Sequence, residues 1–86
     1  MILNKFKIKK VETVLTVGKC LERKREELNI STKNVSERLK IKISYLENLE
    51  ESNYEKLPPD VYVKGFIKSY AQLVGLDPEK MVGIYD

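Results

Sequence analysis

The segment "ISTKNVSERLKIKISYLENLEE", residues 30–51, decides the fold because it contains two short helices joined by a tight turn. Ser31 is placed to cap the first helix, which the apolar spacing ends near Leu39. Lys40 to Lys42 supply a three-residue turn, and the second helix then runs from about Ile43 to Glu51. Two short helices with such a link have the layout of a helix-turn-helix.

Three more helices are predicted on either side of this pair. One precedes it, from about Val17 to Leu28. One follows it within "PPDVYVKGFIKSYAQLVGL", residues 58–76, where Asp60 can cap the start and Gly75 the end. Asp77-Pro78-Glu79 carries the start signals of the last helix, which are a cap, a proline and an acidic residue. The expected fold class is therefore all-α, a five-helix bundle that contains the helix-turn-helix.

Composition limits the classes of function. The 86 residues make one small domain, with little room to enclose a substrate cavity. Cys20 is the only cysteine and histidine is absent, so an intrachain disulfide is excluded and a zinc site is not expected. No Gly-rich phosphate loop, evident carboxylate pair or nucleophile–base pair can be identified. We therefore expect the protein to have no enzymatic activity and to bind neither a metal ion nor a cofactor.

The positive charge is concentrated at the N-terminus. The first ten residues hold four of the 16 Lys and Arg residues and no acidic residue, so 12 basic residues remain against 13 acidic ones. This predicts a nearly neutral domain at residues 16–86, preceded by a basic leader, residues 1–15, that is solvated or disordered. A short edge strand and non-specific contact with nucleic acid are the alternatives for the leader. The longest charge-free run is too short to cross a bilayer, so we expect a soluble, intracellular chain.

Two segments resemble the phage-repressor type of helix-turn-helix domain. They are "LERKREELNIS", residues 21–31, and "YLENLEES", residues 45–52. In that type, an arginine of the first helix pairs with a glutamate of the third, and the matching positions are Arg25 and Glu50. The resemblance implies a buried ion pair that fixes these two helices, with no catalytic role.

A longer resemblance extends from Val17 to Tyr85. The motifs "YLENLEESNYEKLP" and "VYVKGFIKSYAQLVGLDPE" are similar to the cytoplasmic domain of RodZ, the bacterial cell-shape protein. The resemblance implies a non-enzymatic adaptor domain that binds the actin-like filament protein MreB through its fourth helix. The aromatic pair used by that family matches Tyr62 and Phe66. It also implies a position at the cytoplasmic face of the membrane, with a membrane anchor that would follow Asp86 and is absent from this chain.

Helical periodicity gives a separate reason to place Tyr62 and Phe66 at an edge of the fourth helix. At about 100° per residue, the two rings and Leu73 fall on one flank of the apolar arc. The better candidates for the core are Val63, Ile67, Tyr70 and Val74. Because aromatic residues at this spacing are often core residues, burial of the pair is the alternative. Lys64 and Lys68 are expected to flank the edge, either at the rim of an interface or simply solvated.

The rival function is sequence-specific DNA binding by the third helix. Its candidate contacts are Lys40, Lys42, Ser44, Tyr45 and Asn48. Glu47, Glu50 and Glu51 lie on the same helix or its exit and would repel phosphate, which weakens this hypothesis. Lys40 and Ser52 also replace glycines that repressors of this type usually have. We therefore expect no sequence-specific DNA binding by residues 16–86.

Overall fold

The computed structural model describes residues 15–86, which form five α-helices and one 3-10 turn. They are α2 (Val17–Glu27), α3 (Thr32–Leu39), α4 (Ile43–Glu50), η1 (Tyr54–Lys56), α5 (Asp60–Val74) and α6 (Pro78–Tyr85). This part of the chain contains no strand, so the all-α, five-helix prediction is confirmed. The predicted leader and its alternative edge strand lie outside the described residues, except for Leu15. The proposed domain boundary stays a prediction.

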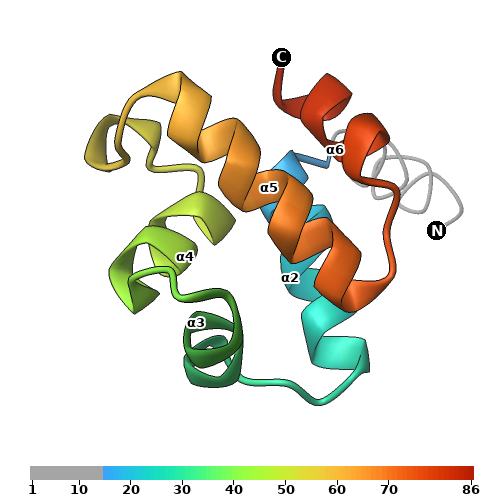
Figure 1. Cartoon of the computed structure of the whole chain (residues 1–86). Coiled ribbons are helices and arrows are strands. Elements are labelled where there is room, and N and C mark those ends of the chain that lie inside the picture. The colour runs from blue at the N-terminus through green and yellow to red at the C-terminus, as the bar shows by residue number, and fades with distance from the viewer. Residues whose placement is uncertain (1–14) are drawn as a thin grey trace, which may run out of the picture.

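Three of the five described helices, α2, α3 and α6, begin at a residue whose side chain caps them, whereas α4 and α5 have no side-chain cap. The hydroxyl of Ser31 accepts a hydrogen bond from the Asn34 backbone N–H, and Asp77 accepts bonds from the backbone of Glu79 and Lys80. Asp60 is not the cap of α5, because Pro59 holds that position and Asp60 is the first helical residue. Figure 1 shows α5 crossing the domain over α2, with α3 and α4 on one side and α6 on the other.

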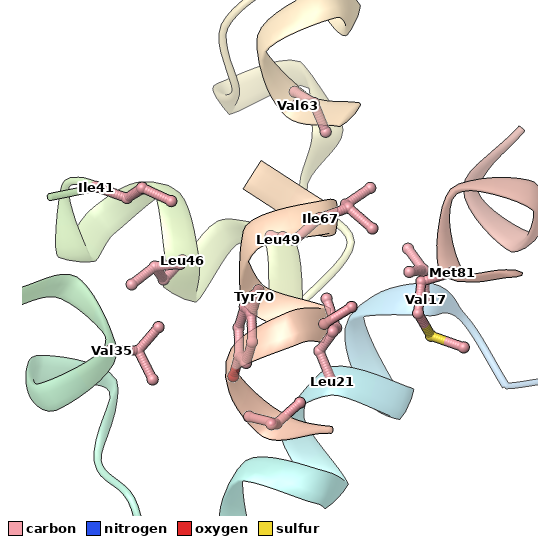
Figure 2. Packing of buried hydrophobic residues seen from close by; sticks show 12 residues of the cluster. Val17, Leu21, Val35, Ile41, Leu46, Leu49, Val63, Ile67, Tyr70 and Met81 are labelled. Carbon is pink, nitrogen blue, oxygen red and sulfur yellow. The ribbon is translucent and has the colours of Figure 1, made fainter. Parts of the chain in front are cut away.

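Apolar side chains from all five helices and the α3–α4 turn meet in one core (Figure 2). Its members are Val17, Leu21, Val35, Ile41, Leu46, Leu49, Val63, Ile67, Tyr70, Ala71, Val74 and Met81. The four core residues predicted for α5 are all among them. Leu28 is 47% exposed because α2 ends at Glu27 and Leu28 is its C-cap. Tyr54, in the loop before α5, is 40% exposed and meets the ring of Tyr85 edge-on.

Gly18 permits a contact between two helix backbones that the sequence analysis did not anticipate. A Cβ atom at this position would lie 2.1 Å from the carbonyl oxygen of Leu49 and 2.9 Å from the Cα of Glu50. Both neighbours are main-chain atoms, which cannot rotate away as a side chain can. Only glycine allows α2 to approach the end of α4 this closely.

Two positions where repressor-type domains usually have glycine adopt the left-handed conformation. Lys40, which ends α3, has φ 59°, and Ser52, which follows α4, has φ 63°. The chain therefore keeps the expected backbone turns while using residues that disfavour them by about 1 kcal/mol each. The departures from glycine change local strain and leave the helix-turn-helix layout intact.

Candidate functional site

The structure brings Arg25 of α2 and Glu50 of α4 together. Arg25 Nε donates to Glu50 Oε2 at 2.8 Å, and a second guanidinium nitrogen donates to Oε1 at 3.0 Å. The two side chains are only 12% and 5% exposed. The remaining guanidinium nitrogen donates to the Ile30 carbonyl oxygen at 3.0 Å, so Arg25 also fixes the α2–α3 link just before the cap of α3.

Tyr70 of α5 completes this network, which the sequence analysis missed because it treated Tyr70 only as an apolar core residue. Its hydroxyl donates to Glu50 Oε2 and accepts a hydrogen bond from Arg25 Nε at 3.1 Å. Burial and the hydrogen bond to the Glu50 carboxylate raise the pKa of Tyr70 above its usual value. The Glu50 carboxylate likewise raises the pKa of Arg25. The phenol on an otherwise apolar helix face was the available signal, since a buried tyrosine hydroxyl needs a partner.

The start of α5, unlike the buried network around Tyr70, carries apolar side chains that are exposed to solvent. Tyr62 is 59% exposed, although it lies between the core residue Val63 and the still more exposed Val61. Phe66, expected at the same edge of the helix, is partly buried and packs against the core. One ring of the predicted pair is therefore open to solvent, and the other is only partly accessible.

The burial of Phe66 has a specific cause on α4. Its ring stacks on Tyr45, with ring centroids 5.7 Å apart and an angle of 25° between the planes. No Cα atom of α4 lies within 8 Å of one in α5, so the side chains bridge a space between the helices. The Lys42 ammonium lies 5.5 Å from the centre of the Tyr45 ring, within the range of a cation–π interaction.

Lys64 and Lys68 do not flank the aromatic pair as expected. Lys64 Nζ lies 3.2 Å from a carboxylate oxygen of Asp86, and Lys68 Nζ lies 3.4 Å from one of Glu79. Both lysines therefore face α6. Lys64 follows Tyr62 by two residues, which places it about 160° away around the helix.

The five DNA-contact candidates are divided by the structure. Lys40, Lys42 and Ser44 are exposed, whereas Tyr45 and Asn48 are partly buried. Tyr45 is engaged by Phe66, and Asn48 accepts a hydrogen bond from Asn53 at 3.3 Å. Glu47 follows Ser44 by three residues on the exposed face of α4, and it is an exposed acid. A base-reading surface is therefore only partly assembled.

Residues 15–86 enclose no pocket and place no three His, Cys, Asp or Glu side chains where they could hold a metal ion. None of the described helices combines the length and apolar character needed to cross a membrane. Nothing in residues 15–86 points to catalysis.

Residues 20–81 match the family model described as a helix-turn-helix domain, and the chain belongs to that family. An uncharacterised protein of Haemophilus influenzae is 36% identical over 66 residues. That match covers 76% of this chain but 22% of the relative, so the chain spans about a fifth of the relative's length.

Among solved structures, the chain is similar to YmfM of Staphylococcus aureus, described as "a putative DNA-binding membrane protein". The TM-score is 0.77 and the sequence identity is 31%, with 83% of this chain and 87% of the other covered. The likeness covers most of this chain. It agrees with the helix-turn-helix part of the RodZ resemblance and leaves the binding partner open.

Proposed function

We propose that this domain is a non-enzymatic adaptor of a bacterial cell-shape protein. It binds an actin-like filament of the MreB type through α5, at the cytoplasmic face of the membrane. The observation that carries the proposal is the 59% exposure of Tyr62 on a helix whose other large side chains mostly pack inward. The RodZ resemblance matches this position to a filament contact.

The physical case rests on the arrangement of Tyr62 and Phe66. The residues are four apart, so they lie on one strip of α5 about one turn apart. Tyr62 has a large ring available to a partner, while Phe66 is held by Tyr45 and offers a partly accessible edge. Exposed aromatic anchors with rigid neighbours are typical of the residues that carry 2 kcal/mol or more of binding energy. Lys64 and Lys68 have at most a peripheral role, because both face α6.

The membrane position belongs to this proposal as well. The Haemophilus relative is much longer than the matched region, and the solved relative is described as a membrane protein. An anchor elsewhere in the whole protein would hold the helical domain beside the membrane, where an associated filament could meet it. The domain itself would contact the partner protein and not the lipid.

Binding and stability should be measured on the same variants to test this function. Tyr62→Ala should weaken co-sedimentation with MreB-type filaments at least tenfold, the loss expected for an anchor side chain of about 1.4 kcal/mol or more. Its melting temperature should change little. Val61→Ala is the matched control, because Val61 is more exposed than Tyr62 and lies about 100° around the helix from it. Ile67→Ala, a core change, should mainly destabilise the fold.

Phe66→Ala should weaken filament binding and also cause a moderate loss of stability, because Phe66 packs on Tyr45. The proposal fails if Tyr62→Ala binds the filament normally while folded. It also fails if Val61→Ala weakens binding as strongly as Tyr62→Ala, since the effect would then not belong to the aromatic strip.

A DNA-binding regulator is the second candidate, favoured by the exposed Lys40, Lys42 and Ser44 and by the description of the Staphylococcus relative. We expect residues 16–86 to select no reproducible motif from a random duplex library at moderate salt. Specific sites are usually bound at about 10⁻⁸ to 10⁻¹¹ M. Recovery of a motif bound in that range would make the DNA-binding regulator the better-supported function and the filament adaptor the second candidate.

A further inference from the structure

The aromatic strip of α5 continues onto α4. Tyr45 stacks on Phe66 across a space that the two helix backbones leave between them. Tyr62, Phe66, Tyr45 and Lys42 therefore form one surface built from two helices, called here the bridge surface. A protein that covers Tyr62 and Phe66 would also reach Tyr45 and the lysine beside it.

Lys42 gives the bridge surface a positive charge. Its ammonium lies 5.5 Å from the centre of the Tyr45 ring, and it makes no salt bridge within residues 15–86. Lys64 and Lys68, by contrast, each have a carboxylate partner, Asp86 at the C-cap of α6 and Glu79 within α6. The nearest exposed acid along α4, Glu47, is two residues from Tyr45 and hence about 160° around the helix. The cation beside the aromatic residues is thus available to an incoming group.

We infer that the bridge surface binds an apolar protein segment that carries a carboxylate. The apolar part covers Tyr62 and Phe66, and the carboxylate pairs with Lys42. Tyr45 is a positioning residue, because its ring sets the orientation of Phe66 and holds the ammonium of Lys42 nearby. This inference rests on the proposed function and specifies the chemistry of the contact with the filament.

The geometry favours a protein segment over a nucleic acid. Single-stranded binding uses aromatic rings as open platforms on which bases stack. The Tyr45 ring is already engaged by Phe66 and by Lys42, and Asn48 is engaged by Asn53. An apolar segment needs only Tyr62 and the part of Phe66 that remains exposed. A carboxylate beside the exposed Lys42 ammonium then supplies register and a salt-dependent association rate.

Filament co-sedimentation at low and high salt tests the charge. Lys42→Glu should weaken binding about tenfold at low salt, because it turns an attractive pair into a repulsive one. The loss should shrink at about 0.5 M salt, where the Debye length is on the order of 4 Å. Lys80→Glu is the matched control, since Lys80 is an exposed lysine on α6, which packs on the other side of α5. That variant should bind within about twofold of wild type.

The role of Tyr45 is tested by two substitutions. Tyr45→Ala removes the stacking partner of Phe66 and should weaken binding about fivefold or more, whereas Tyr45→Phe keeps the ring and should bind like wild type. Melting curves identify any variant that fails to fold. If Tyr45→Ala unfolds, the inference still requires normal binding by Tyr45→Phe and the salt-dependent loss in Lys42→Glu.

The outcomes separate this inference from the proposed function. If Tyr62→Ala weakens filament binding but Lys42→Glu and Tyr45→Ala do not, the bridge surface is wrong and the adaptor function stands. If Tyr62→Ala has no effect, the adaptor function itself fails. Loss of random-duplex DNA binding by Lys42→Glu, with filament binding unchanged, would assign Lys42 to nucleic acid and overturn the inference.

Discussion

Two tyrosines on α5, eight residues apart, have opposite environments. Tyr70 is 0% exposed and sits in the core, whereas Tyr62 is 59% exposed at the start of the same helix. Eight residues correspond to a rotation of only about 80°, so both belong to one broad apolar arc. The same residue type on nearly the same helix face thus serves the core at one end and remains open to a partner at the other.

The difference lies in what the neighbouring helices offer to the phenol. Tyr70 reaches the guanidinium of Arg25 and the carboxylate of Glu50, which satisfy its buried hydroxyl. The Tyr62 side chain makes no hydrogen bond within residues 15–86. A tyrosine can be buried fully only where such partners exist. The charged pair on α2 and α4 therefore helps to determine which of the two tyrosines is buried in the core.

The largest expected effect comes from breaking the charged pair that Tyr70 depends on. Arg25→Ala leaves Glu50 buried without its cation and should reduce the free energy of unfolding by about 3–5 kcal/mol. Lys24→Ala is the control, because Lys24 lies one residue away and makes only a 3.4 Å pair with the exposed Glu27. Chemical denaturation of both variants checks this. Similar, small losses in the two would show that the pair contributes little.

The hydroxyl of Tyr70 should have a smaller but clear effect. Tyr70→Phe keeps the ring and removes a hydrogen bond to a buried charged group, so stability should fall by about 1.5–3 kcal/mol. Urea denaturation gives the difference directly. A loss below about 0.5 kcal/mol, which is usual for surface substitutions, would mean that the hydroxyl is not needed to stabilise Glu50.

Alkaline pH provides a second way to test Tyr70. Its pKa is raised in the folded protein by burial and by Glu50, so above about pH 10 the unfolded chain releases the phenol proton while the folded chain keeps it. The folded state then binds more protons, and stability decreases as pH rises, by up to about 1.4 kcal/mol per pH unit for this group. Tyr70→Phe should show a shallower decrease between pH 10 and 11. Parallel curves for the two proteins would contradict the assignment.

The smallest effect is expected at Tyr62. Tyr62→Phe makes the same chemical change as Tyr70→Phe, but at an exposed ring, and should alter stability by less than about 0.5 kcal/mol. Measuring both variants under the same conditions turns the comparison of the two tyrosines into a single experiment. Equal losses of stability at the two positions would mean that the Tyr62 hydroxyl stabilises the folded domain as much as the Tyr70 hydroxyl does.

The sequence was sufficient for the elements governed by local signals. Ser31 and Asp77 cap their helices as predicted, and the apolar spacing of α5 identified Val63, Ile67, Tyr70 and Val74 as core. The repressor-type resemblance correctly joined Arg25 to Glu50. Each of these inferences depends on neighbours in sequence or on a family pattern.

The features that escaped prediction depend on contacts between distant residues. Nothing near Phe66 in sequence indicates that Tyr45 would stack on it, and nothing near Lys64 indicates that Asp86 would lie beside it. The position of Lys64 relative to Tyr62 could have been obtained from the helical wheel alone. The contact at Gly18 could not, because a glycine inside a helix does not reveal which backbone approaches it.

That contact has a consequence for anyone who wishes to transplant the surface of α4 and α5 onto another scaffold. Where two helices meet through side chains, their spacing can be adjusted by changing residue size. At Gly18 the main chains themselves meet, with Leu49 and Glu50 on the other side, so there is no side chain to adjust. A grafted surface would need this glycine and its segment of α2 as well. Without them, the distance between α2 and α4 would change, and Tyr45 would move away from Phe66.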